Sequence, residues 1–176
     1  MSDQDLIEKI KKIKVLLLDV DGVLTDGRII YDSHGRDSKF FDVHEGMRVH
    51  LLKKAGIPTV LVTAKGSRAI MPSAKDMQVD RVFENVSPKT DVLDEVLRNY
   101  KVTNEELCFV GDDLVDLCLM KQVGFAVAVS NGCAEVKRIA SYVSSREGGR
   151  GAVREIAELI LKTQGKWEEQ VKKYEG

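Results

Sequence analysis

The chain has 176 residues, of which 43% are hydrophobic and 31% are charged, the composition of an ordinary folded protein and not of a disordered or collagen-like one. At about 100–200 residues per domain, we expect residues 1–176 to form a single domain. The 27 basic and 28 acidic residues leave a net charge of −1, which provides no bulk field to attract nucleic acid or an anionic membrane. The apolar runs are far shorter than the roughly 20 residues that span a bilayer.

Short β-branched runs alternate with helical periodicity along most of the chain. In chain order we expect an N-terminal helix at 1–13, a buried strand at 14–20, a β-hairpin at 28–43, a helix at 46–55, a strand at 58–63, helices at 67–77 and 90–99, a strand at 107–111, a helix at 114–121, a strand at 125–129, a helix after the Gly-rich run at 148–151 and a C-terminal tail at 163–176. This order predicts an α/β fold, a Rossmann-like doubly wound parallel sheet with helices on both faces.

The N-terminal residues suit an amphipathic helix because Leu6, Ile10 and Ile13 recur at helical spacing among acids and lysines. They lack the apolar core and cleavage site of a signal peptide, so we expect a cytoplasmic protein. The three cysteines are an odd number without a C-x-x-C pair. We interpret them as reduced core residues and not as a disulfide frame or a zinc site.

Residues 28–43 interrupt the alternation and predict a flap. Two stretches that alternate polar and apolar residues flank Ser33-His34-Gly35, the pattern of a β-hairpin that projects from the sheet. The spans 22–58 and 64–88 are too short for a cap domain once the hairpin and the helices are placed. A capless site is open to water, so we expect closure by a macromolecular substrate or by a neighbouring subunit. The charged tail at 163–176 is expected to dock on the body or on a neighbour.

Polar residues gather just after the predicted strands, where doubly wound sheets bind their ligands. Each one alone could cap a turn or end a strand. Together they would place several carboxylates and one lysine at one sheet edge, and such carboxylates repel one another unless a cation joins them. Oxygen ligands of this kind suit Mg²⁺, which also binds phosphate oxygens. The sequence therefore predicts a magnesium-dependent phosphoryl site built from Asp19, Asp21, Thr63, Lys89, Asp112, Asp113 and Asp116.

The order of the residues suggests their roles. Asp19, at the tip of the first strand, is the expected nucleophile, and its attack on phosphorus would form an aspartyl-phosphate. Asp21 lies two residues on, on the same side of an extended strand, where one carboxyl can serve as both general acid and general base.

The remaining residues are expected to balance charge. Thr63 would donate a hydrogen bond to the phosphoryl group and Lys89 would offset its charge. Asp112 would complete the metal site, with either Asp113 or Asp116 as a further ligand or as the residue that holds the metal's waters.

These segments resemble the four motifs of the haloacid dehalogenase superfamily of phosphatases. The resemblance rests on 19–27, Thr63, Lys89 and the run Gly111-Asp112-Asp113-Leu114-Val115-Asp116. It implies a phosphoric monoester hydrolase in which Asp19, the Asp21 carbonyl and Asp112 bind Mg²⁺.

More narrowly, the hairpin and the run at 148–155 resemble the family of 3-deoxy-D-manno-octulosonate 8-phosphate (KDO 8-phosphate) phosphatases, from lipopolysaccharide precursor synthesis. This resemblance implies hydrolysis of KDO 8-phosphate to KDO and inorganic phosphate through an aspartyl-phosphate. It also implies a homotetramer whose hairpins pair into a barrel and whose active sites are completed by neighbouring subunits, with Arg150 on the segment that reaches a neighbour.

The chain departs from that family's pattern where the sugar acid would bind. Asp42-Val43-His44-Glu45-Gly46 stands where members usually have Asn-Val-Arg-Asp-Gly, and both Lys65 and His50 stand where arginines are common. Because lysine offers a point charge and arginine a bidentate grip, the alternative substrate is a nonulosonate 9-phosphate such as KDN or N-acetylneuraminate 9-phosphate. The expected substrate-binding residues are Asp21, Asp42, Val43, His44, Glu45, Gly46, His50, Lys65, Lys89 and Arg150.

Two alternatives belong to other classes of protein. A phospho-accepting receiver also combines acids, Thr, Lys and Mg²⁺ on a parallel sheet, but it lacks an acid placed as Asp21 is beside Asp19. A non-catalytic oligomerisation module can lose its catalytic acids, whereas this chain retains all of them. Catalysis is therefore the preferred interpretation.

Overall fold

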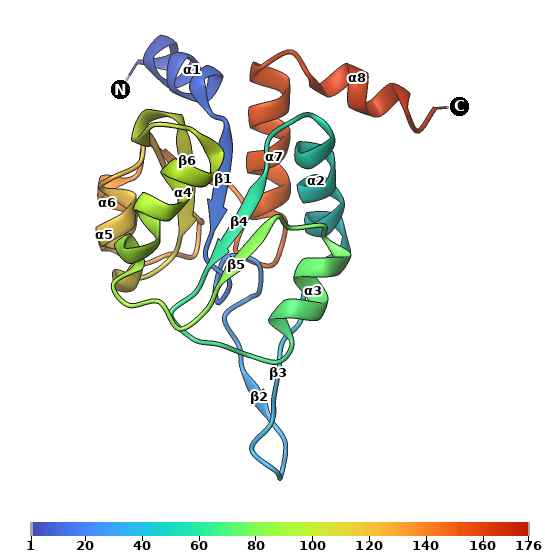
Figure 1. The fold of residues 1–176 in the computed structure, drawn as a ribbon, viewed down its shortest axis with the longest axis vertical. Coiled ribbons are helices and arrows are strands. Elements are labelled where there is room, and N and C mark those ends of the chain that lie inside the picture. The colour runs from blue at the N-terminus through green and yellow to red at the C-terminus, as the bar shows by residue number, and fades with distance from the viewer. Residues whose placement is uncertain (1, 176) are drawn as a thin grey trace.

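A six-stranded parallel sheet forms the centre of the computed structural model, which describes residues 2–175 (Figure 1). The order across the sheet is β5-β4-β1-β6-β7-β8, and each neighbouring pair runs parallel. The strands are β1 (Val15–Leu18), β4 (Thr59–Val62), β5 (Arg81–Phe83), β6 (Leu107–Gly111), β7 (Phe125–Ala128) and β8 (Tyr142–Val143). The predicted fold class is confirmed.

The central strands are apolar throughout because both faces of the sheet are covered. In β1, Leu16 and Leu18 enter one buried cluster while Val15 and Leu17 enter the other, as the period of two along a strand requires. All four residues are at most 1% exposed. Burying each such side chain contributes about 1.5–3 kcal/mol to folding.

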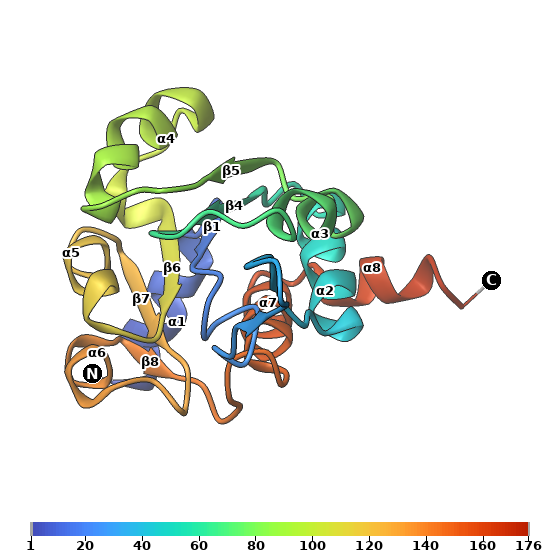
Figure 2. The ribbon, with the colours of Figure 1, turned by 90° about the horizontal axis from the view of Figure 1, so that it is seen from below.

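The helices form two layers, one on each face (Figure 2). One layer contains α1 (Asp3–Lys12), α2 (Val43–Lys54), α3 (Ile70–Asp76) and α7 (Ala152–Thr163). The other contains α4 (Leu93–Tyr100), α5 (Leu117–Met120) and α6 (Ala134–Ile139). Three short 3-10 helices, η1 (Lys89–Val92), η2 (Asn104–Glu106) and η3 (Leu114–Asp116), join strands to helices, and α8 (Trp167–Lys172) follows α7. None of the described helices is long and apolar enough to cross a membrane.

The predicted hairpin is present and projects from the carboxyl end of the sheet (Figure 1). Its strands, β2 (Ile30–Tyr31) and β3 (Asp37–Ser38), pair antiparallel over two residues each. The Asp32 carboxylate closes the turn by accepting hydrogen bonds from the backbone N–H groups of His34 at 2.8 Å and Arg36 at 2.9 Å. Apart from this hairpin, the sheet of residues 2–175 carries no large insertion, and a cap domain is absent from the described part of the chain.

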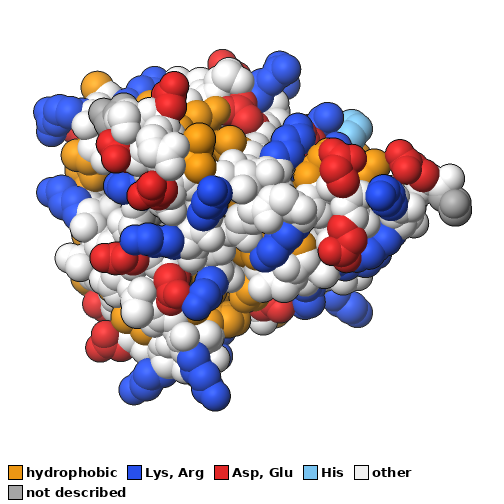
Figure 3. Space-filling view, turned by 90° about the horizontal axis from the view of Figure 1, so that it is seen from above, with side chains coloured by type: hydrophobic (Ala, Val, Ile, Leu, Met, Phe, Trp, Pro, Cys, Tyr) orange, Lys and Arg blue, Asp and Glu red, His pale blue; other side chains and the backbone are white. Residues whose placement is uncertain are grey.

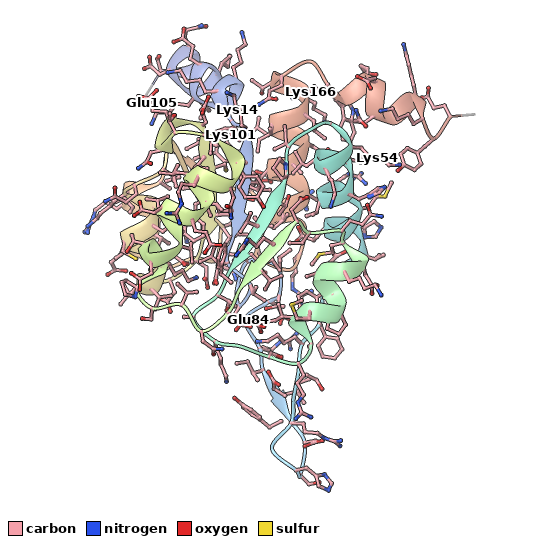
Figure 4. All side chains as sticks on the ribbon, in the orientation of Figure 1. Lys14, Lys54, Glu84, Lys101, Glu105 and Lys166 are labelled. Atoms are coloured by element: carbon pink, nitrogen blue, oxygen red, sulfur yellow. The ribbon has the colours of Figure 1, made fainter. Side chains whose placement is uncertain are left out.

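The opposite end of the sheet carries interspersed charges of both signs (Figure 3). Lys14, Lys101 and Glu105 lie at this end, far from Glu84 beside the hairpin (Figure 4). Lys12 pairs with Glu105 at 3.2 Å and Lys14 with Glu106 at 2.5 Å. Both of these acids therefore have a basic partner in the protein.

Several predicted elements differ in detail. The expected helices at 90–99 and 114–121 each begin with a 3-10 turn, and the short strands β5 and β8 and the helix α6 were not predicted. Edge strands of two or three residues leave too short a pattern to detect. Of the three cysteines expected in the core, Cys108 is buried there, Cys133 is half-buried and packs against the core, and Cys118 is partly exposed on α5. Met1 and Gly176, the ends of the predicted N-terminal helix and C-terminal tail, lie outside the described residues.

Candidate active site

Three carboxylates converge where β1 and β6 end. Asp19 follows β1, while Asp112 and Asp116 follow β6, its neighbour in the sheet. Carboxylate oxygens of the three lie within 4.8 Å of one another. Adjacent parallel strands end at one edge, which is why residues almost a hundred positions apart meet here.

Lys89 lies between two of these acids. It is the first residue of η1 and is only 1% exposed, and its Nζ donates to Asp19 Oδ1 at 2.5 Å and to Asp116 Oδ1 at 2.6 Å. Burial opposes the charged form of Lys89, but the carboxylates of Asp19 and Asp116 raise its pKa above the ordinary value. The lysine is therefore a permanent cation inside the acidic cluster.

Asp116 is oriented by donors of the protein. Its Oδ2 accepts hydrogen bonds from the backbone N–H groups of Asp112 at 2.8 Å and Asp113 at 3.2 Å, in addition to the contact of Oδ1 with Lys89. A Cβ at Gly111 would lie 2.6 Å from the Asp116 carboxylate, so the glycine makes room for it. These bonds favour Asp116 as the residue that holds the Asp112 loop in place. Asp113 is exposed, and its Oδ1 accepts from the N–H of Leu114 at 2.8 Å as the N-cap of η3.

The positive charge of Lys89 does not fully compensate the other two carboxylates, those of Asp19 and Asp112. Burial raises the pKa of Asp19 to about 6, with Asp116 adding to the shift and Lys89 opposing it. Burial and the neighbouring carboxylates of Asp19, Asp116 and Asp113 raise the pKa of Asp112 to about 8. A divalent cation would relieve this repulsion. A Cβ at Gly22 would lie 2.0 Å from Asp112 Oδ2, so the loop leaves the carboxylate room, and the oxygen donors fit Mg²⁺.

The loop between Asp19 and the hairpin is stabilised by hydrogen bonds among its own residues. The buried Thr25 hydroxyl accepts hydrogen bonds from the backbone N–H groups of Gly22 and Gly27, both at 3.3 Å. Gly22 has a φ of +91°, a left-handed conformation that glycine adopts without strain. The loop thereby turns Asp21 toward the same opening as Asp19.

A cavity of about 240 Å³ opens onto these carboxylates. Its lining comprises Asp19, Asp21, Gly27, Thr63, Ala64, Lys65, Lys89, Asp112, Asp113 and Val115. Thr63 follows β4, and its hydroxyl donates to the Lys65 carbonyl at 3.0 Å. Lys65 Nζ reaches Tyr31 Oη on the hairpin at 2.5 Å. All seven residues predicted for catalysis and metal binding lie around this one edge, with Asp116 behind the cavity wall. Lys39, which pairs with Asp21, was not predicted.

The predicted substrate-binding residues are spread more widely. Val43 and His44 lie exposed at the start of α2, where Asp42 is the N-cap. Gly46 and His50 line a separate cavity of about 460 Å³ between α2 and α3, and Arg150 contacts Asp26 at 3.4 Å. Of the predicted set, only Asp21, Lys65 and Lys89 line the acidic cavity within this chain.

Glu45 is not placed to contact a substrate. It is completely buried, and its two oxygens accept hydrogen bonds from the backbone N–H groups of Gly151 at 2.9 Å and Arg154 at 2.8 Å. Helix α7 has no side-chain cap of its own because its N-cap is Gly151. Glu45 therefore caps α7 from a neighbouring helix, a role that sequence spacing could not reveal across more than a hundred residues.

Burial raises the pKa of Glu45 to about 7, although the N–H groups of Gly151 and Arg154 lower it. Because this pKa is higher in the folded protein than in the unfolded chain, the folded state binds the proton more tightly. The free energy of unfolding therefore falls as the pH rises from the unfolded-state pKa to the folded-state pKa. Compared with Glu45→Gln, the wild type should therefore lose roughly 2–3 kcal/mol of unfolding free energy between about pH 5 and pH 8. Urea unfolding at both pH values measures the difference, with the exposed Glu168→Gln as control. A difference that does not change with pH would contradict the assignment.

The parallel sheet with its acidic edge defines a class of hydrolase. The family model described as haloacid dehalogenase-like hydrolase matches residues 81–156, and the chain is a hydrolase of this class. The 3-deoxy-D-manno-octulosonate 8-phosphate phosphatase KdsC of Escherichia coli K12 is 33% identical over 165 residues, covering 94% of this chain and 88% of that protein. Its Yersinia pestis counterpart is 34% identical over 164 residues, covering 93% and 88%. The chain therefore belongs to the family of KDO 8-phosphate phosphatases.

Solved structures of similar proteins share the whole fold. The KDO 8-phosphate phosphatase of Moraxella catarrhalis, crystallised with magnesium, phosphate and KDO, has a TM-score of 0.94 and 32% identity, covering 98% of this chain and 99% of that one. A putative hydrolase of the same superfamily from Legionella pneumophila has a TM-score of 0.94 and 38% identity, covering 97% and 94%. The first of these relatives carries a magnesium ion, the cation that the acidic edge of this chain fits.

Proposed function

We propose that the chain is a Mg²⁺-dependent phosphatase that hydrolyses KDO 8-phosphate to KDO and inorganic phosphate. The observation that carries this proposal is the convergence of the Asp19, Asp112 and Asp116 carboxylates beside a small cavity, with buried Lys89 between Asp19 and Asp116. The names of the curated relatives supply the substrate.

The first half of the reaction is transfer of the phosphoryl group to the protein. Asp19 and Asp112, with the Asp21 carbonyl, would hold Mg²⁺, which neutralises and orients the phosphate when bound. A carboxylate oxygen of Asp19 attacks phosphorus, and the bond from phosphorus to the sugar oxygen breaks. Asp21 gives its proton to that departing oxygen.

The second half of the reaction releases phosphate. Asp21, now ionised, accepts a proton from water, and the water oxygen attacks the phosphorus of the aspartyl-phosphate. Asp19 leaves as a carboxylate. Lys89, within 2.5 Å of Asp19, and the Thr63 hydroxyl balance the charge on the phosphoryl oxygens in both halves.

A homotetramer remains a prediction of this proposal. The hairpin and its base expose apolar side chains, with Ile30 at 49%, Tyr31 at 57% and Phe40 at 66%. Two strands of two residues each bury too little to hold such side chains alone, which supports pairing with hairpins of other copies. Neighbouring subunits would then bring the 42–46 segment or Arg150 to an adjacent cavity. The predictions that the protein lies in the cytoplasm and that its product is a lipopolysaccharide precursor also stay predictions.

Lys65 is the reason to keep a second candidate, a nonulosonate 9-phosphate phosphatase. It replaces the arginine common in the family, and its ammonium group is engaged by Tyr31. A point charge held by a phenol grips a sugar carboxylate less directly than a guanidinium does. The two candidates share the site and the chemistry and differ only in the sugar acid.

Phosphate release over a panel of sugar phosphates tests the proposal. With Mg²⁺ present, KDO 8-phosphate should give the highest kcat/KM against KDN 9-phosphate, N-acetylneuraminate 9-phosphate and glucose 6-phosphate. Chelation should abolish release, and added Mg²⁺ should restore it. Preference for a nonulosonate phosphate would select the second candidate. Labelling of the protein without many equivalents of released phosphate would indicate a receiver, and inactivity without labelling an oligomerisation module.

A further inference from the structure

Lys39 has a buried side chain on a hairpin that is otherwise largely exposed. It follows β3, between exposed Ser38 and Phe40, so the alternation of an extended chain directs it inward. Its side chain is 0% exposed. An ammonium group taken out of water costs several kcal/mol unless it is paired and hydrogen-bonded, so this position calls for a specific partner.

The partner is Asp21. Lys39 Nζ donates to Asp21 Oδ1, and the Asp21 side chain is 25% exposed beside the cavity. The contact joins two segments 18 residues apart, one on the loop after β1 and one on the return strand of the hairpin. The lysine engages Oδ1 of this carboxylate.

We propose that Lys39 is a positioning residue for Asp21, an inference that rests on the proposed function. By holding Oδ1, Lys39 directs Oδ2 toward the oxygen of the leaving sugar. In the first half of the reaction Oδ2 carries the proton while Oδ1 accepts from Lys39. In the second half, Lys39 pairs with the ionised carboxylate as Oδ2 accepts a proton from water.

In this arrangement Lys89 and Lys39 act on different steps of the reaction. Lys89 contacts Asp19 and Asp116, so its loss affects the nucleophile with any substrate. Lys39 contacts Asp21, so its loss affects only proton transfer. Departure of an alkoxide requires a proton, whereas departure of p-nitrophenolate does not, because it is stable as an anion. The choice of leaving group therefore separates the two roles.

The test compares Lys39→Met with wild type on two substrates, KDO 8-phosphate and p-nitrophenyl phosphate. The constant kcat/KM reports events through cleavage of the ester bond and omits the later attack of water. We expect Lys39→Met to lower kcat/KM about 100-fold or more for the sugar phosphate and less than about tenfold for the aryl phosphate. Lys39→Arg, which keeps a donor near Oδ1, should recover part of the loss on the sugar phosphate.

Arg36→Met is the matched control, since Arg36 lies exposed on the same hairpin and pairs with Asp32. It should leave both constants near wild type, and thermal unfolding checks that each variant is folded. Equal losses on both substrates, or no loss on either, would overturn the role of Lys39. A wild type inactive on both substrates would instead refute the proposed function, and the inference with it. If Lys39→Met does not fold, Lys39→Ala takes its place in the same comparison, and equal losses on both substrates, or no loss on either, would again overturn the role in favour of a purely structural lysine.

Discussion

Asp19→Asn should lower phosphate release on the order of 10⁴-fold or more while the protein stays folded, because an amide cannot replace a carboxylate as nucleophile. The asparagine oxygen can still accept the hydrogen bond that Lys89 donates at 2.5 Å. The substitution also removes one of three crowded carboxylates, and burial together with their mutual repulsion raises the pKa values of Asp19 and Asp112. Steady-state phosphate release and a urea unfolding curve measure the two halves of this prediction.

The matched control is Asp94→Asn, which removes an exposed carboxylate from the outer surface of α4. It should leave both activity and stability near wild type. Release by Asp19→Asn within about tenfold of wild type would show that another group attacks phosphorus, because that loss is far smaller than removal of a nucleophile produces. Such a result would withdraw the aspartyl-phosphate on Asp19 from the mechanism.

Lys89→Met should damage both activity and stability. The substitution leaves Asp19 and Asp116 facing each other in the interior without their cation, and breaking a buried ion pair in this way costs about 3–5 kcal/mol. Release should fall on the order of 10³-fold because the phosphoryl charge is no longer offset. Urea unfolding with and without Mg²⁺ measures the loss. Added Mg²⁺ should recover part of it, since ligands that bind the folded state stabilise it.

Lys12→Met supplies the comparison for this second variant. Lys12 also pairs with an acid, Glu105, but both side chains are more than half exposed. Such a pair contributes at most about 1 kcal/mol. If Lys89→Met were no less stable than Lys12→Met, the acids around Lys89 would have to be neutral in the folded protein, and its place as the internal counter-ion would be lost.

The sequence was sufficient for the four central strands of the sheet, β4, β1, β6 and β7, and for the edge that carries the chemistry. The strand at 107–111 was predicted with the bounds that the structure shows, because a buried strand is a continuous apolar run that ends in polar residues. Asp19, Thr63, Lys89 and Asp112 could be assigned to one edge because strand ends in a parallel sheet share that edge.

Side-chain direction could not be predicted in the same way. Both Asp113 and Asp116 follow β6, and the contacts of Asp116 with Lys89 and with two backbone N–H groups distinguish the buried residue from the exposed one. Glu45 and Lys39 each act through a partner on another element. Contacts between distant segments depend on packing, which a single sequence encodes only through the whole fold.

The hairpin has strands of only two residues each, so Asp21, which contacts it, is held less firmly than Asp19. Asp19 stands on β1, in the middle of the sheet and paired on both sides, whereas the anchor of Asp21 belongs to an appendage with little internal support of its own. Loosening that appendage would leave Asp19 and its contact with Lys89 in place but slow the protonation of the departing alcohol, and with it phosphoryl transfer from a sugar phosphate.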